Sequence, residues 1–371
     1  MANILDIRRR IRSVVNTRQI TKAMKTVSAA KLRRAQEAAL AARPYAQMLT
    51  NVLKSLMSRT DIYDPKTGDP LHPLLAMRAE KIILLIVVTG DKGLAGAFNT
   101  NILKLASKFI QSKPDKNIDV ECIGRKGRDF MRRRYPMAPQ RRKEDDNPQN
   151  ELGGTEVSPV RRDAEGVPER AGRVQIVGEY VGVLGKVEHN FASTLGQSII
   201  ERYIRGEIDA VYILFNEFKS VIAQRLVAVR LLPITEIGDI DVQMVEEPSE
   251  EERKRRIEAA KSAHTGLRTP DTGEIDEAAG KFASAPVDYI YEQPPGELFQ
   301  GILPKYIGIQ IFRALLESVA AEHSARMTAM DAATNNASDM IDSLTLVMNR
   351  ARQAKITKEI IEIVSGAAAA G

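Results

Sequence analysis

The feature that most constrains the fold is the absence of glycine and proline at both ends of the chain. Neither residue occurs between Ile309 and Ser365, and neither occurs in residues 1–43. As continuous α-helices these two segments would extend over about 85 Å and about 65 Å at 1.5 Å per residue. Helices of globular proteins average roughly 11–12 residues. Two such long helices at opposite ends of one chain predict a coiled coil.

Heptad periodicity supports this prediction. Two rows spaced by four and three residues form an a/d pattern, and Ile4, Ile7, Ile11 and Val14 begin a similar seam at the N-terminus. Small and polar residues in these rows predict a thin rod, with two ordinary helices of a bundle as the alternative. The C-terminal rows are Leu316, His323, Met330, Ala337, Leu344 and Ala351, and Ala320, Met327, Thr334, Ile341 and Met348.

The middle of the chain is predicted to be a separate α/β domain, which argues against a simple bundle. It begins with the continuous apolar run IILLIVVT at 82–89, which is typical of a buried parallel strand. Strand and helix patterns then alternate, so we expect a twisted, mostly parallel sheet. Further strands are expected at 120–123, 174–180, 210–215, 221–231 and 287–291, and helices at 101–111 and 191–205.

Two polar segments interrupt this domain. Residues 137–173 combine four prolines with many charges and almost no large apolar residue, which predicts a flexible insertion. Residues 236–285 carry the charge run EEPSEEERKRRIEAAK and are expected to form a short charged helix and a loop. The predicted divisions are therefore 1–62 (N-terminal coil helix), 78–295 (α/β domain with both insertions) and 300–371 (C-terminal coil helix).

Signatures of catalysis and of cofactor binding are missing from the sequence. Cys122 is the only cysteine, so no internal disulfide and no multi-thiolate metal site can form. The four histidines show no HExxH spacing, and the turn GDKGLAG after the first strand matches neither GxxxxGK[ST] nor GxGxxG. We interpret that turn as structural and expect a non-catalytic protein without a cofactor.

The N-terminus concentrates the positive charge. The net charge of the whole chain is only +6, yet residues 1–34 contain ten basic residues against the single acid Asp6. Such a helix can bind nucleic acid, an anionic membrane or an acidic protein surface. The first aromatic residue is Tyr45, and single-strand binding usually needs interleaved aromatics. An acidic protein partner is the interpretation that we favour, with Arg8, Arg9, Arg10 and Arg12 as a basic shaft, and a solvated helix face without a partner is the alternative.

The C-terminal end is unusually apolar for a free surface. Gly366 and four alanines follow a group of five β-branched residues. These five are Ile356, Ile360, Ile361, Ile363 and Val364. An isolated apolar helix tip would be an aggregation hazard in water. We therefore expect this tip to extend beyond the shorter first helix into a socket of a partner.

No run of 18 apolar residues predicts a membrane span, and no secretory signal is recognisable, so a soluble protein of a reducing compartment is expected.

Over nearly its whole length the chain resembles the gamma subunit family of F-type ATP synthase. The resemblance rests on five ordered motifs: IRRRIRSVVNTRQITKAMKTVSAAKLRRAQ, TGDKGLAGAFNTN, GRKGRDF, EIDAVYILFNEFKSVIAQ with LLP, and ITKEIIEIVSGAAA. One departure is Ala95, which stands where the family often has a cysteine. The resemblance implies an antiparallel coiled coil of the terminal helices with a Rossmann-like α/β domain at its base.

The family role implied by this resemblance is that of a rotor. The coil would turn inside a ring of three alpha and three beta subunits, while its foot contacts the epsilon subunit and the proton-driven c-ring. By similarity, Met24 and Lys25 would face an acidic lever loop of beta. The positions that match contacts to the beta catch loop are Arg352, Gln353, Thr357 and Glu359.

Membrane association would then occur through the complex, at the cytoplasmic face of a bacterial inner membrane or the stromal face of a thylakoid. The second insertion lies where photosynthetic relatives carry a regulatory extension, but a single cysteine excludes dithiol control. A brake on ATP hydrolysis by the insertions stays a hypothesis. The competing classes are a coiled-coil adaptor whose basic arm binds nucleic acid or anionic membrane, and a nucleotide-binding α/β enzyme.

Overall fold

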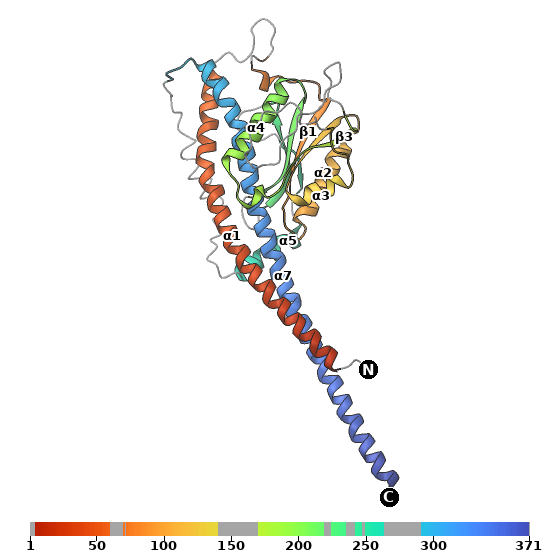
Figure 1. The fold of residues 1–371 in the computed structure, drawn as a ribbon. Coiled ribbons are helices and arrows are strands. Elements are labelled where there is room, and N and C mark those ends of the chain that lie inside the picture. Colours follow the sequence, from red (N-terminus) through yellow and green to blue (C-terminus); the bar gives the residue numbers. More distant parts are fainter. Residues whose placement is uncertain are drawn as a thin grey trace, which may run out of the picture.

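The computed structural model describes residues 4–59, 70, 72–139, 170–218, 224–234, 242–246, 249–262 and 291–370. Two very long helices, α1 (Ile4–Arg59) and α7 (Pro295–Ala370), run beside one α/β unit (Figure 1). The coil predicted from the terminal segments is therefore confirmed, together with the fold class.

Both long helices continue through a proline. Pro44 lies inside α1 and Pro304 lies inside α7, although proline removes a backbone donor and costs about 3 kcal/mol in a helix interior. Beyond Pro44, Leu53 and Leu56 are fully buried in the apolar core, and on the N-terminal side of Pro304 the side chains of Phe299 and Leu303 are buried too. Packing of these residues outweighs the local penalty, so each helix is longer than its proline-free segment.

The sheet has six strands in the order β3-β2-β1-β4-β5-β6. The first four are parallel, and β5 and β6 continue the sheet antiparallel to their neighbours. β1 is the central parallel strand, with Leu85 opposite both Val120 and Tyr212. The strand bounds are β1 Ile82–Val88, β2 Asn117–Ile123, β3 Val174–Tyr180, β4 Ala210–Phe218, β5 Gln224–Leu232 and β6 Val242–Glu246.

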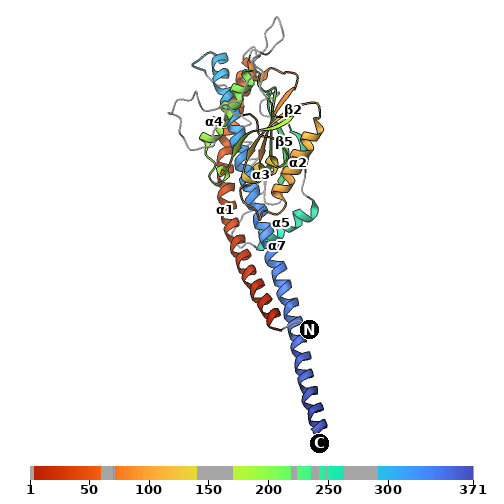
Figure 2. The same cartoon turned by 45° about the vertical axis from the view of Figure 1, so that its right-hand side comes forward.

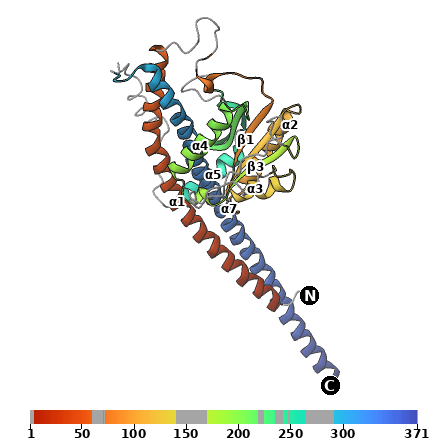
Figure 3. The same ribbon diagram turned by 45° about the horizontal axis from the view of Figure 1, so that its top comes forward.

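Helices cover both faces of this sheet, which gives the unit three layers (Figures 1 and 3). Side chains of β1 alternate between two cores because successive residues of a strand point to opposite faces. Leu84 and Ile86 join α4 (His189–Ile204), α7 and the second half of α1, whereas Ile83 and Leu85 join α2 (Phe98–Ser112) and α3 (Arg125–Arg132). The continuous apolar run of β1 is explained by this burial on both sides.

The structure adds elements that the sequence pattern did not predict. α3 follows β2 directly, and β6 lies inside the segment 236–285, where a helix and a loop were expected. The expected charged helix is present as α5 (Glu250–Ser262), and it packs against α7. The strand expected at 287–291 and almost all of the insertion at 137–173 lie outside the described residues, and the domain boundaries stay a prediction.

Candidate functional site

The coiled coil of α1 and α7 is the largest feature that could transmit force or bind a partner. Every position of the two heptad rows on α7 is buried or half-buried, which confirms the predicted seam. On α1, Ile7, Leu32 and Ala39 are buried, while Ala30 and Ala38 are exposed. Small side chains thus line only part of the contact between the helices, and apolar anchors complete it.

Two polar contacts fix the register of the coil. The ammonium of Lys25 pairs with Oδ1 of Asp331 at 2.6 Å, and their side chains are 12% and 9% exposed. One turn further along, the hydroxyl of Thr334 donates to Oγ1 of Thr21 at 2.8 Å. Residue numbers fall on one helix as they rise on the other, so the coil is antiparallel, as predicted.

We predict that Lys25→Met costs about 2–3 kcal/mol of unfolding free energy, because Asp331 stays buried and loses its ammonium partner. The double variant Lys25→Met/Asp331→Leu should recover most of this loss, since two apolar groups need no partner. Urea unfolding followed by far-ultraviolet circular dichroism measures both values in a double-mutant cycle. Additive losses from the two substitutions would contradict a coupled pair.

No helix of the described residues lies beside the last part of α7. The register of the coil brings Ile4 to the level of Ala351, and every residue of 352–365 is exposed. Figures 1 and 2 show α7 extending well past the end of α1. Ile363 and Val364 on this free end are 71% and 62% exposed. The expectation of a projecting apolar tip is therefore confirmed, and this tip offers apolar surface to another molecule.

The candidate contact residues lie at two levels of this stalk. Met24 is half-buried and Lys25 is occupied by Asp331, so neither presents a free side chain to solvent. The other four, which lie on the exposed end of α7, are Arg352, Gln353, Thr357 and Glu359. Of these, Glu359 pairs with Lys355 at 3.6 Å. The two groups lie far apart along the coil, so they would meet different parts of a partner.

The four arginines of the basic shaft are all exposed near the start of α1. Arg9 approaches Asp6 at 3.8 Å, and these side chains are 81% and 62% exposed, a geometry that contributes little to stability. Arg8, Arg10 and Arg12 have no ion-pair partner among the described residues. Their charges are therefore available to an anionic surface.

The glycine-rich turn after β1 is held by side chains, in line with its structural interpretation. Gly90 donates its N–H to Oδ1 of Asn99 at 2.8 Å. Asp91 accepts from the N–H groups of Arg125 and Gly182, at 2.9 and 3.1 Å. These bonds connect the turn to α3 and to the segment that follows β3. The turn thus fixes three loops at the carboxyl ends of the strands.

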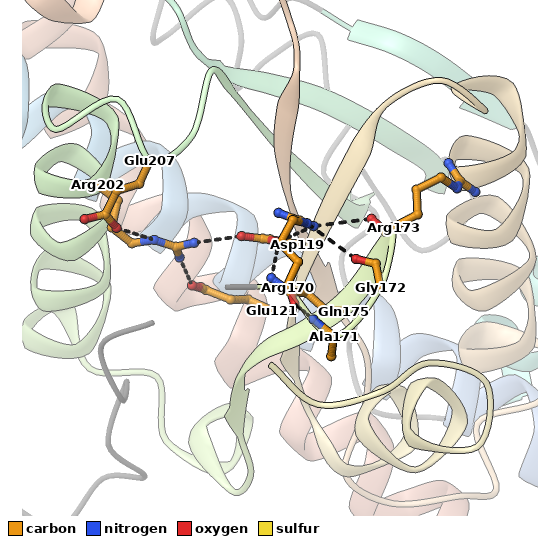
Figure 4. A network of polar contacts seen from close by, with 9 residues as sticks. All are labelled: Asp119, Glu121, Arg170, Ala171, Gly172, Arg173, Gln175, Arg202 and Glu207. Atoms are coloured by element: carbon orange, nitrogen blue, oxygen red, sulfur yellow. Dashed lines mark hydrogen bonds and ion pairs between the residues drawn. The ribbon is translucent and has the colours of Figure 1, made fainter. Parts of the chain in front are cut away.

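A buried charge network lies between α4 and the edge of the sheet (Figure 4). Arg202 of α4 donates to Oε1 of Glu121 at 3.0 Å and to Oδ2 of Asp119 at 3.3 Å. Arg170 pairs with the other oxygen of Asp119 at 2.8 Å, and Gln175 donates to that oxygen too. Burial raises the pKa of Glu121, which Arg202 partly opposes.

Sequence patterns did not reveal this network. Its members are separated by dozens of residues, and the predicted second strand began only after Asp119. A usable signal was nevertheless present, because Asp119 and Glu121 alternate with Ile118 and Val120. Two acids on one face of an otherwise apolar strand indicate a buried cationic partner.

Cys122 lies in the same strand and is completely buried. Burial, with Glu179 and Glu121 nearby, raises the pKa of its thiol to about 12. Because the thiolate is the reactive form, we predict no measurable reaction of the folded chain with a disulfide reagent at about pH 8. One thiol per chain should react after denaturation. Stoichiometric labelling of the folded chain would contradict the buried placement.

Among the described residues no cluster of three or more histidine, cysteine or carboxylate side chains could hold a metal ion. A search of the same residues found no helix that is long and apolar enough to cross a membrane.

The fold and the exposed tip define the class of the protein as a subunit built around a long stalk. A family model described as ATP synthase matches residues 3–370. The chain is 44% identical over 370 residues to the ATP synthase gamma chain of Solibacter usitatus, covering 100% of both chains. It is 39% identical to the gamma chain of Pelotomaculum thermopropionicum, covering 100% of this chain and 99% of that one.

Solved structures show the same fold. A chain in the mitochondrial ATP synthase structure of Euglena gracilis, with OSCP, F1 and c-ring in rotational state 3, aligns with a TM-score of 0.50 and 15% identity. The alignment covers 99% of this chain and 94% of that one. The chain belongs to the ATP synthase gamma chain family. Gamma chains are non-catalytic subunits of the central stalk, a peripheral part of the F1 sector, and the catalytic sites are on beta.

Proposed function

We propose that this chain turns as the central shaft that couples proton-driven rotation of the c-ring to ATP synthesis on the beta subunits. The observation that carries this proposal is the shape of the stalk, an antiparallel coil that ends in one exposed helix. A two-helix coil of this length resists bending and twisting, as torque transmission requires. A seam closed by Lys25–Asp331 keeps the two helices from sliding past each other.

Different partners are proposed for the two ends of the molecule. The coil would lie inside a ring of alpha and beta subunits, and the α/β unit would contact the epsilon subunit and the c-ring. The exposed arginines would face acidic stator surfaces through long-range attraction, which fixes no single angular position. Membrane attachment would occur through the complex, at the cytoplasmic face of a bacterial inner membrane or the stromal face of a thylakoid.

Two sets of residues are proposed to contact beta. Met24 and Lys25 would meet its acidic lever loop, with the Lys25 ammonium shared with Asp331 because that pair is formed within the coil. Arg352, Gln353, Thr357 and Glu359 would meet its catch loop from the single-helix end of α7. Exposure of all four residues supports this role, since none is required to close the coil.

Native purification with identification of partners tests the assignment. We expect the tagged chain to co-purify with alpha and beta, and the isolated chain to lack ATPase activity. A chain that binds DNA or anionic vesicles but neither subunit would support the adaptor alternative instead.

Substitution of Arg8, Arg10 and Arg12 by glutamine should weaken binding to the alpha–beta ring more in low salt than in high salt, because at high salt screening already reduces these attractions.

The second insertion is proposed to limit reverse rotation. Its helix α5 packs against α7, and Ala259 on that helix is buried, so the insertion touches the shaft directly. Deletion of residues 240–283 from the complex should raise ATP hydrolysis relative to ATP synthesis. Unchanged hydrolysis and unchanged inhibition would contradict the proposal.

A further inference from the structure

A pocket of about 480 Å³ lies where the coil meets the carboxyl ends of the parallel strands. Its walls come from α1, the turn after β1, the segment after β3 and α7. The pocket adjoins the segments that follow β1 and β3, at the carboxyl edge of the parallel strands. Its volume falls within the range of roughly 300–1,000 Å³ of small-molecule sites.

Five cations line this pocket, and three of them come from α1 and the glycine-rich turn. Lys31 and Arg34 lie on α1, and Lys92 lies on the glycine-rich turn, far away in sequence. None of the three has an ion-pair partner among the residues that the structure describes. Repulsion between like charges opposes such an arrangement, so it indicates an anionic ligand.

The two acids of the pocket offset its positive charge only in part. Asp91 accepts hydrogen bonds from two backbone N–H groups, at 2.9 and 3.1 Å. Glu322 is paired with Arg326 on the next turn of α7. Lys186, also in the wall, is paired with Glu188 at 2.6 Å. The wall thus carries five basic and two acidic side chains, which leaves a net positive charge in the cavity.

The wall formed by α7 is fixed in place. Arg326 donates to the carbonyl of Gly93 from Nε and Nη2, at 3.4 and 3.3 Å, which joins α7 to the turn. Its Nη1 lies 3.3 Å from Nδ1 of His323. Burial, followed by the charges of Arg326 and Lys31, lowers the pKa of His323 to about 4, so this ring is neutral at pH 7. These contacts hold α7 and the turn after β1 together at one side of the pocket.

We propose that this coil–sheet pocket binds a small phosphorylated organic anion. Lys31, Arg34 and Lys92 would hold the phosphate groups, because charge-assisted hydrogen bonds from such cations are the strong ones. The organic part would lie against the apolar walls, which include Leu184, Leu316 and Val319. An acidic protein segment could reach the same cations but would leave these apolar walls uncovered, so a small molecule fits better. The proposal concerns the chain alone and does not rest on its rotor role.

Isothermal titration of the full-length chain with ADP tests this proposal, with pyrophosphate and a hexaglutamate peptide titrated in parallel. We expect one saturable site for ADP. Lys31→Gln/Arg34→Gln/Lys92→Gln should weaken ADP binding about tenfold or more. Ala38→Phe, at an exposed lining position, should also weaken it by filling the cavity without changing the charge.

A matched control removes three exposed cations that do not line the pocket, through Lys54→Gln/Lys104→Gln/Arg133→Gln. It should bind ADP as tightly as the unmodified chain does, and circular dichroism should show the same fold in every variant. No saturable ADP binding would overturn the proposal, as would equal losses in the two triple variants. Binding of the peptide without binding of ADP would reassign the pocket to an acidic protein segment, which also overturns it.

Discussion

The substitution Arg202→Met should remove about 3–5 kcal/mol from the unfolding free energy. Arg202 carries the only cation that hydrogen-bonds Glu121 among the described residues, and the Glu121 side chain is 1% exposed. Loss of the guanidinium leaves this carboxylate buried and uncompensated, while Asp119 keeps Arg170 and Gln175. Thermal unfolding followed by circular dichroism should show the midpoint lowered by about 10 °C.

The pH dependence of this variant identifies the cause. Burial raises the pKa of Glu121, so the folded chain binds its proton more readily than the unfolded chain does. Stability attributable to this group therefore increases as the pH falls from neutral toward the ordinary carboxyl range. We expect Arg202→Met to regain part of its stability there, and Arg202→Met/Glu121→Gln to regain it at neutral pH.

Arg205→Met on the adjoining turn is the matched control. Arg205 is 59% exposed and pairs with Glu201 at 3.4 Å, so its loss should change stability by less than about 1 kcal/mol. Equal destabilisation by the two substitutions would show that the buried network is not the source of the effect.

Gly124→Ala is expected to prevent the α/β unit from folding. A Cβ at this position would lie 1.8 Å from the carbonyl oxygen of Thr89, and Gly124 has a φ of +101°. The clash is with backbone, which cannot rotate away, so the loss should exceed about 4–5 kcal/mol, the range of exceptional single substitutions. Soluble yield and the cooperativity of thermal unfolding are the measurements.

Two other glycines separate the causes of this loss. Gly182 also has a positive φ, +88°, but a methyl group at this position would have no heavy atom within 4 Å, so Gly182→Ala should cost only about 1–2 kcal/mol. Gly93 has neither constraint, and Gly93→Ala should stay within about 0.5 kcal/mol. A folded, stable Gly124→Ala chain would mean that β1 and α3 do not meet as described.

The stalk could be predicted from sequence because its information is local. Long segments without glycine or proline, and apolar residues at heptad spacing, specify helices and a seam without reference to the rest of the chain. Pro44 and Pro304 show the limit of this reasoning, since buried residues beyond them carry each helix through a local penalty. The strands of the parallel sheet were recognisable for the same reason, as short apolar runs between turns.

Contacts between distant segments were not predictable in this way. Lys25 was interpreted only through its family resemblance, yet its partner in the structure is Asp331, 306 residues away. Arg202 is joined to Glu121 and Asp119 of β2 across 81 and 83 residues. Three cations of the coil–sheet pocket meet only after α1 folds against the turn. Charge and periodicity show that such residues need partners, but only the fold identifies them.

Rotation of this chain within its complex tests the rotor role most directly. Met77 is 72% exposed on the α/β unit, so Met77→Cys provides a labelling site, and buried Cys122 should not compete for the label. With the alpha–beta ring fixed to a surface and a bead attached at position 77, added ATP should drive rotation in one direction with three pauses per turn. ATP hydrolysis by an assembled complex whose bead stays still would contradict the account.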